Sequence, residues 1–303
     1  MEEEIVNLLE KKGPLTGSEI WTAIGGDGLD LWRVCKLSDE LIIHAIGTRY
    51  LRLDRRVLDF VRLSPSIWRE FLTYSVVGLS RDRSFIEKKA QNVILSMEKV
   101  SKAKRELGYR IVSGLASQFD REYVLETRAC FIIAGDVVYN MAHNVPRPEK
   151  STGKMVNGSD IDLVVLADES VSDKLLTRLD EAIYKEKYRL LLTPHVREEI
   201  DYVVKNLDRV REQIAFDTFR NMVACKILNE GQLLFGSKGL FNEVKRMLRA
   251  EGITEKLERM EIRARAFREN AKEFLLQADR EKVQEEHAHL FYPTEESEEF
   301  ELV

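Results

Sequence analysis

Three short apolar runs, each long enough for a buried strand, constrain the fold of this chain most strongly. They cover residues 129–134, 161–166 and 200–204. Apolar stretches of this length, bounded by turn-forming residues, are typical of strands inside a sheet. The second and third runs also carry aspartates at or near their start, and an unpaired buried carboxylate is costly. The sequence therefore predicts a sheet whose acidic side chains are paired or bind a cation.

The acidic side chains of this sheet are Asp160, Asp162 and Asp201. Asp160 and Asp162 lie one residue apart in the stretch Asn-Gly-Ser-Asp-Ile-Asp at 157–162. Because side chains alternate between the two faces of a strand, both carboxylates are expected on the same face. With Asp201 from a neighbouring strand they would form a site of hard oxygen ligands, which suits Mg²⁺. Two such ions can clamp an in-line phosphoryl transfer.

The segment from about Cys130 to Lys245 resembles the DNA polymerase β-like nucleotidyltransferase superfamily. The likeness rests on a strand that ends at Gly135, an Asp-x-Asp strand and a third strand with an aspartate. Downstream, Ile-Leu-Asn-Glu-Gly-Gln-Leu-Leu-Phe-Gly-Ser at 227–237 resembles the helix, glycine turn and short strand that close many compact members.

The resemblance implies a function and a set of catalytic residues. It implies Mg²⁺-dependent transfer of a nucleoside monophosphate from an NTP to a hydroxyl acceptor, with release of pyrophosphate. Asp160 and Asp162 would hold both metal ions, and Asp201 would complete the metal site nearer the acceptor. The acceptor is expected to be a nucleic-acid end or a protein side chain.

Further residues are expected to bind the triphosphate of the nucleotide. The first glycine of the superfamily is usually followed by serine or glycine, whereas here Asp136 follows, and a helix cap is the favoured interpretation of its role. Lys226 is either such a ligand or, as favoured, an exposed charge on a helix. The connection from Gly135 to Asp160 either covers the site or is a disordered insertion. The nucleotide-binding candidates are Gly135, Asp136, Ser159, Lys150, Lys154 and Lys226.

Residues 1–80 predict three short helices followed by two strands. The third helix is expected at 29–37, with Trp32 left available on its surface, and the strands at 41–46 and 49–53 are expected to pair as a hairpin. This order resembles a winged helix-turn-helix, which commonly places its third helix in a DNA major groove. The basic residues expected to contact DNA or RNA phosphates are Arg33, Lys36, Arg49, Arg52, Arg55 and Arg56. The alternative is a solvated surface on a protein-binding or dimerisation wing.

The chain is expected to be an α+β protein: an N-terminal winged helix-turn-helix, then a mixed-sheet nucleotidyltransferase domain with C-terminal helices. The predicted divisions are a winged-helix-like domain at 1–80, a linking amphipathic helix at 81–118, the nucleotidyltransferase domain at 119–250, a C-terminal helix at 251–284 and a mobile acidic tail at 285–303.

Composition excludes several other classes of protein. The net charge of −5 gives no overall nucleic-acid signature, so contact with a polyanion requires a local basic patch. Cys35, Cys130 and Cys225 have no C-x-x-C spacing, which predicts neither disulfides nor zinc and favours a reducing cytoplasm. No apolar run approaches transmembrane length, so no membrane partner is expected.

Other functions remain consistent with the sequence. A winged-helix nucleic-acid-binding regulator, whose nucleotidyltransferase domain senses nucleotide without turnover, is compatible with the altered Gly135-Asp136 element. A scaffold that self-associates through the long helix after Thr254 is a third alternative. His143 and His195 have no partners at metal-ligand spacing and are expected to be structural or surface residues.

Overall fold

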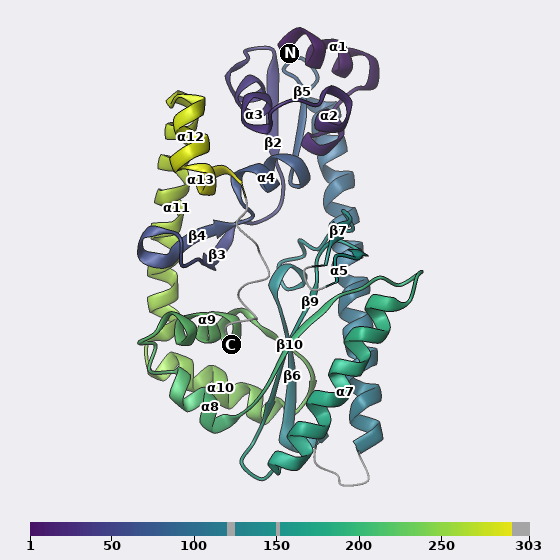
Figure 1. Cartoon of the computed structure of the whole chain (residues 1–303), viewed down its shortest axis with the longest axis vertical. Coiled ribbons are helices and arrows are strands. Elements are labelled where there is room, and N and C mark those ends of the chain that lie inside the picture. The colour runs from purple at the N-terminus through teal and green to yellow at the C-terminus, as the bar shows by residue number, and fades with distance from the viewer. Residues whose placement is uncertain (120–124, 150–151, 293–303) are drawn as a thin grey trace. The chain divides into compact units, whose positions relative to one another are not determined.

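The computed structural model describes residues 1–119, 125–149 and 152–292, in which helices and strands form two compact units (Figure 1). Among these residues, unit 1 combines 1–96 with 259–292, and unit 2 comprises the described part of 97–258. The α+β class is confirmed. The division differs from the expected linear order, because residues 259–292 belong to the same unit as residues 1–96.

Unit 1 contains most of the short elements of the chain. They are α1 (Glu2–Lys12), β1 (Leu15–Thr16), α2 (Gly17–Ile24), α3 (Gly28–Leu37), β2 (Leu41–Ala45), β3 (Tyr50–Leu53), η1 (Leu58–Phe60), β4 (Val61–Ser64), α4 (Ile67–Thr73), β5 (Ser75–Leu79), α12 (Arg280–Glu286) and α13 (Ala288–Phe291). The long helices α5 (Arg83–Phe119) and α11 (Ile253–Gln277) each contribute residues to both units.

The first helices of unit 1 begin at polar caps that the sequence supplies. The Thr16 hydroxyl accepts a hydrogen bond from the backbone N–H of Glu19 at 3.2 Å, and the Glu19 carboxylate accepts one from the Thr16 N–H at 2.7 Å. Together these two hydrogen bonds form a capping box. The Asp27 carboxylate accepts from the N–H groups of Leu29 and Asp30 and so starts α3. The three predicted helices are present, and α3 at Gly28–Leu37 agrees with the expected 29–37 to within one residue.

The strand pairing of unit 1 differs from the expected hairpin. β2 pairs antiparallel with β5, and β1 pairs with the other edge of β5. β3 pairs instead with β4 in a separate two-stranded sheet. The hairpin between 41–46 and 49–53 is therefore wrong. Both β5 and β3 are buried along their whole length, but β5 has no charged side chain whereas β3 contains Arg52, so β5 is the more apolar partner for β2.

The C-terminal helices α12 and α13 belong to the core of unit 1. The Phe291 ring is fully buried, with its centroid 5.5 Å from that of Trp32 and 5.4 Å from that of Trp68. Burying such a side chain stabilises a fold by about 1.5–3 kcal/mol. The expectation of a mobile tail is therefore wrong for residues 285–292, and so is the expected availability of Trp32. Residues 293–303 lie outside the described part of the chain.

Three of the six residues predicted to contact nucleic acid are instead buried or bound to other residues inside unit 1. The Arg33 guanidinium donates to two backbone carbonyls at the C-terminal end of α11, at 2.7 and 2.5 Å, where a helix lacks internal donors. Arg49 forms an ion pair with Glu70 at 3.1 Å, and Arg52 is buried. The exposed members of the set are Lys36, Arg55 and Arg56. Unit 1 thus presents a smaller basic surface than its composition suggests.

Unit 2 is built on a four-stranded mixed sheet of order β10-β9-β6-β11. β9 and β10 are parallel, and the other two pairs are antiparallel. The elements are α6 (Leu125–Arg128), β6 (Ala129–Ala134), η3 (Gly135–Val137), β7 (Arg147–Pro148), β8 (Met155–Val156), β9 (Ile161–Ala167), α7 (Asp173–Leu192), β10 (Ile200–Asn206), α8 (Leu207–Gln213), α9 (Phe219–Glu230), β11 (Gln232–Gly236) and α10 (Lys238–Ala250).

Helices cover both faces of this sheet (Figure 1). Alternate residues of β6 and β9, beginning at Ala129 and Ile161, pack in one core with α5 and α7. The intervening residues face the other side, on which α9 and α10 contact β6. Asp162 belongs to this second face. In the part of the chain that the structure describes, every helix is too short or too polar to span a lipid bilayer.

Candidate metal centre

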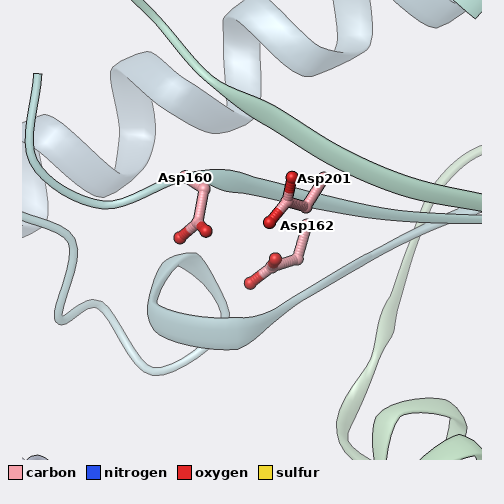
Figure 2. A group of neighbouring side chains, drawn as sticks. All are labelled: Asp160, Asp162 and Asp201. Carbon is pink, nitrogen blue, oxygen red and sulfur yellow. The ribbon is translucent and has the colours of Figure 1, made fainter. Parts of the chain in front are cut away.

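The structure brings the three predicted aspartates together at the start of β9 and β10. The parallel pairing places Asp201 directly beside Asp162, and Asp160 precedes β9 by one residue. One carboxylate oxygen of each residue lies within 4.8 Å of the others. Figure 2 shows the carboxylates turned toward a common space. Strand alternation thus places both members of the Asp-x-Asp pair on one side of the sheet, as the sequence predicts.

Burial and repulsion disfavour the charged forms of the Asp162 and Asp201 carboxyl groups. Burial, followed by the charges of Asp160 and Asp201, raises the pKa of Asp162 well above its ordinary value. Burial and Asp160 raise the pKa of Asp201 to about 6, and Lys187 opposes the shift. Carboxylates held this close are stabilised in their charged form by a cation.

Gly135 makes room for the innermost carboxylate. Its φ is +65°, and a Cβ at this position would stand 1.8 Å from Oδ2 of Asp162. The turn at the end of β6 therefore requires glycine both for its left-handed backbone and for the space that Asp162 fills.

Gly135→Ala is expected to lower the free energy of unfolding by about 1–3 kcal/mol, through backbone strain and displacement of Asp162. Denaturant unfolding with and without Mg²⁺ measures the effect, and the stabilisation by Mg²⁺ should fall in this variant. Gly114→Ala is the matched control, because Gly114 is an exposed position in α5 where a Cβ meets no atom within 4 Å. It should gain up to about 1 kcal/mol. Equal responses of the two variants would contradict the role of Gly135.

Two cations that the sequence interpretation missed contact the outer aspartates. Lys187 of α7 donates to Oδ1 of Asp201 at 2.9 Å. Arg147 of β7 lies 3.4 Å from Oδ2 of Asp160 and 2.8 Å from the Glu199 carboxylate. Both cations come from segments distant in sequence from their partners, so no local pattern indicates these contacts.

Glu199 and Asp136 add negative charge around the three aspartates. Burial, opposed by Arg147, raises the pKa of Glu199 to about 7. Oδ2 of Asp136 accepts a hydrogen bond from the Ser159 hydroxyl at 2.7 Å. The residue that precedes η3 is Ala134, and no side chain caps this short helix. The favoured role of Asp136 as a cap is therefore wrong, because its carboxylate is directed to Ser159 instead.

Lys226 is buried rather than exposed. Its Nζ lies 3.1 Å from Oε1 of Glu230, and the Tyr139 hydroxyl donates to the other oxygen of Glu230 at 2.8 Å. The charge of Glu230 in turn raises the pKa of Asp162. The favoured surface position of Lys226 is wrong because this part of α9 is buried on the face of the sheet that carries Asp162.

The connection between Gly135 and Asp160 contains a short hairpin, β7 paired with β8. Lys154 is exposed in its turn, and Lys150 lies outside the described residues. Ser159 is buried and accepts a hydrogen bond from the His143 N–H at 3.3 Å, so its side chain joins two loops of the site. His143 has a structural role, because its Nδ1 accepts a backbone hydrogen bond at 3.1 Å; His195 is exposed.

The donor set fits a hard divalent cation. Mg²⁺ and Mn²⁺ prefer carboxylate oxygens, and Asp160, Asp162 and Asp201 offer three from one face of a sheet. Because Gly135 has no side chain, the Asp162 carboxylate fits beside it. Comparisons with protein families, with curated proteins and with solved structures found no match for this chain.

Proposed function

We propose that this chain is a divalent-cation-dependent nucleotidyltransferase whose metal ligands are Asp160, Asp162 and Asp201. The observation that carries the proposal is the approach of their carboxylate oxygens to within 4.8 Å of one another. Bound Mg²⁺ supplies charge stabilisation to a transferring phosphoryl group and lowers the pKa of an attacking hydroxyl. The protein contributes the fixed position of the ligands and their negative charge.

The topology of unit 2 supports membership of the DNA polymerase β-like superfamily. β6 ends in the turn at Gly135, the Asp-x-Asp pair starts β9, and the parallel neighbour β10 carries Asp201. α9, Gly231 and β11 follow in the order expected for the closing elements. The reaction that fits this arrangement is transfer of a nucleoside monophosphate from an NTP to a hydroxyl acceptor.

The test is transfer of a labelled α-phosphate. The full chain is incubated with Mg²⁺ and each of the four NTPs, in separate reactions with DNA, RNA and protein acceptors. We expect label to become attached to one acceptor class while pyrophosphate is released. Binding of NTP without consumption of any NTP in every reaction would reject the enzyme and favour a sensor.

A regulator that binds nucleic acid is a second candidate, and the fold of unit 1 favours it. Its order of α1, β1, α2, α3, β2 and β5, with a three-stranded sheet, suits a winged helix-turn-helix with a long insertion between the last two strands. The exposed residues that would contact phosphates are Lys36, Arg55 and Arg56. Their joint replacement by glutamine should weaken DNA or RNA binding and reduce its dependence on salt. Unchanged binding would exclude this surface.

Stabilisation by Mg²⁺ is expected to increase with pH between about 5 and 8. The folded-state pKa values of Asp201 and Glu199, about 6 and about 7, lie above ordinary unfolded values of about 4. In metal-free protein these groups therefore reduce stability as pH rises through that window, since the folded state retains protons that the unfolded state has lost. A bound cation favours the deprotonated groups and removes this cost.

Thermal unfolding at pH 5, 6, 7 and 8, with and without Mg²⁺, measures this dependence. The increment in melting temperature due to Mg²⁺ should be largest at pH 8. In Asp162→Asn the increment should be small at every pH. If the Mg²⁺-dependent increment in melting temperature is the same at every pH, or is largest at pH 5, the assignment of the cation to Asp160, Asp162 and Asp201 is contradicted.

A further inference from the structure

Lys187 is placed as a counter-ion of the acidic cluster. Its Nζ lies 2.9 Å from Oδ1 of Asp201, and the two side chains are 23% and 13% exposed. Among the described residues, Asp201 is the only hydrogen-bond partner of this ammonium group. A charge-assisted contact of this kind fixes the carboxylate where it faces Asp160 and Asp162.

Arg147, the other cation at the cluster, is anchored differently. Besides Asp160 and Glu199 it contacts the Gly158 carbonyl, to which its Nε donates at 2.8 Å. These contacts tie its guanidinium to the loop that precedes β9. The Lys187 ammonium ends a flexible four-carbon stem and has no such backbone anchor among the described residues. It can leave Asp201 by rotation of its own side chain.

The carboxylate that Lys187 contacts is also one of the three that converge. A divalent cation bound among them would share Asp201 with the ammonium, and two positive charges a few ångströms apart repel each other. We infer that Lys187 is a displaceable counter-ion: it holds Asp201 in ligand position in the metal-free protein and yields that carboxylate when a divalent cation binds. The inference rests on the metal site of the proposed function. Lys187 thereby also sets the affinity of that site for the divalent cation.

Mn²⁺ binding to the full chain, measured calorimetrically without nucleotide or acceptor, tests this competition. Lys187→Met removes the ammonium and should bind Mn²⁺ about tenfold more tightly than the natural protein, which corresponds to a lost competing contact of about 1.4 kcal/mol. Lys187→Arg keeps the charge and should remain within about threefold. Lys185→Met is the matched control, because Lys185 is exposed on the same helix. This control should leave the affinity for Mn²⁺ unchanged.

A second readout separates competition from a merely structural ion pair. Without metal, Lys187→Met should melt at a lower temperature than the natural protein, because the carboxylates lose their counter-ion. Saturating Mn²⁺ should remove that difference. Lys187→Gln, whose shorter and uncharged side chain also removes the ammonium from Asp201, provides the same affinity test should the methionine variant fail to fold.

Equal or weaker Mn²⁺ binding by the uncharged variants would overturn the inference, as would no Mn²⁺ binding by any variant. The proposed function can fail separately. If Lys187→Met binds Mn²⁺ more tightly but the natural protein shows no nucleotidyl transfer, the counter-ion role of Lys187 is supported and only the proposed enzymatic activity is rejected.

Discussion

Asp162→Asn is expected to reduce nucleotidyl transfer by about 10²–10³-fold and to make the metal-free protein more stable. Transfer is lost because the innermost ligand no longer carries charge toward a bound cation, and contacts that stabilise developing charge contribute about 10²–10³-fold each. Metal-free stability rises because burial, Asp160 and Asp201 already disfavour this carboxylate, as its raised pKa shows. The gain is expected at neutral pH, where the unfolded state has lost the proton that the buried carboxyl retains. Label transfer and denaturant unfolding measure the two effects.

The opposite signs of the two effects make this variant informative. A residue needed only for folding would lose activity and stability together. Asp168→Asn is the matched control, since Asp168 follows the other end of β9, where its carboxylate pairs with Arg128 at 3.2 Å. It should leave transfer and the response to Mg²⁺ unchanged. Retained transfer in Asp162→Asn, or a loss of metal-free stability, would contradict the role of Asp162.

Arg268→Met is expected to lower the stability of unit 1 by about 3–5 kcal/mol. Arg268 of α11 is 5% exposed and donates to the carbonyl oxygens of Leu63 and Pro65 and, at 2.8 Å, to the Glu70 carboxylate. Methionine fills much of the same space but removes the donor to the Pro65 carbonyl and one of the two guanidinium groups that Glu70 contacts, leaving Glu70 with Arg49. Tryptophan fluorescence during denaturant unfolding measures the loss, because all the tryptophans of the chain lie within residues 1–96.

Arg265→Met is the control for this buried network. Arg265 lies one helical turn earlier, and its side chain is 56% exposed. It pairs with Glu261 on the same helix and donates an exposed hydrogen bond to the Arg49 carbonyl at 3.2 Å. Exposed pairs of this kind contribute little, so the change should stay within about 0.5 kcal/mol. A loss below about 1 kcal/mol in Arg268→Met would show that α11 is not held to unit 1 by these contacts.

The sequence was most informative where the geometry is local. Asp160 and Asp162 are separated by one residue in a strand, so alternation alone places them on one face. The capping box at Thr16 and Glu19 is likewise a local pattern, and its hydrogen bonds are present. The strands at 161–166 and 200–204 are likewise indicated by their apolar composition, although residues 201–204 are only half-buried.

The side-chain contacts and strand pairings that the sequence does not predict depend on which separate segments of the chain pack together. Local residue patterns carry little information about such packing. Lys187 looks like any exposed lysine on an amphipathic helix, and only the packing of α7 beside β10 brings it to Asp201. Arg33 likewise appeared free to bind phosphate, but α11, more than two hundred residues later, supplies its carbonyl partners. In unit 1, β2 pairs with β5, and the sequence pattern does not predict a strand at β5.

Anomalous diffraction from crystals grown with Mn²⁺ and a non-hydrolysable NTP tests the metal centre most directly. We expect a manganese peak at about 2.0–2.6 Å from carboxylate oxygens of Asp160, Asp162 and Asp201, with phosphate oxygens of the nucleotide among its other ligands. A peak bound elsewhere, or contact with only one of the three aspartates while the nucleotide is present, would contradict the nucleotidyltransferase assignment.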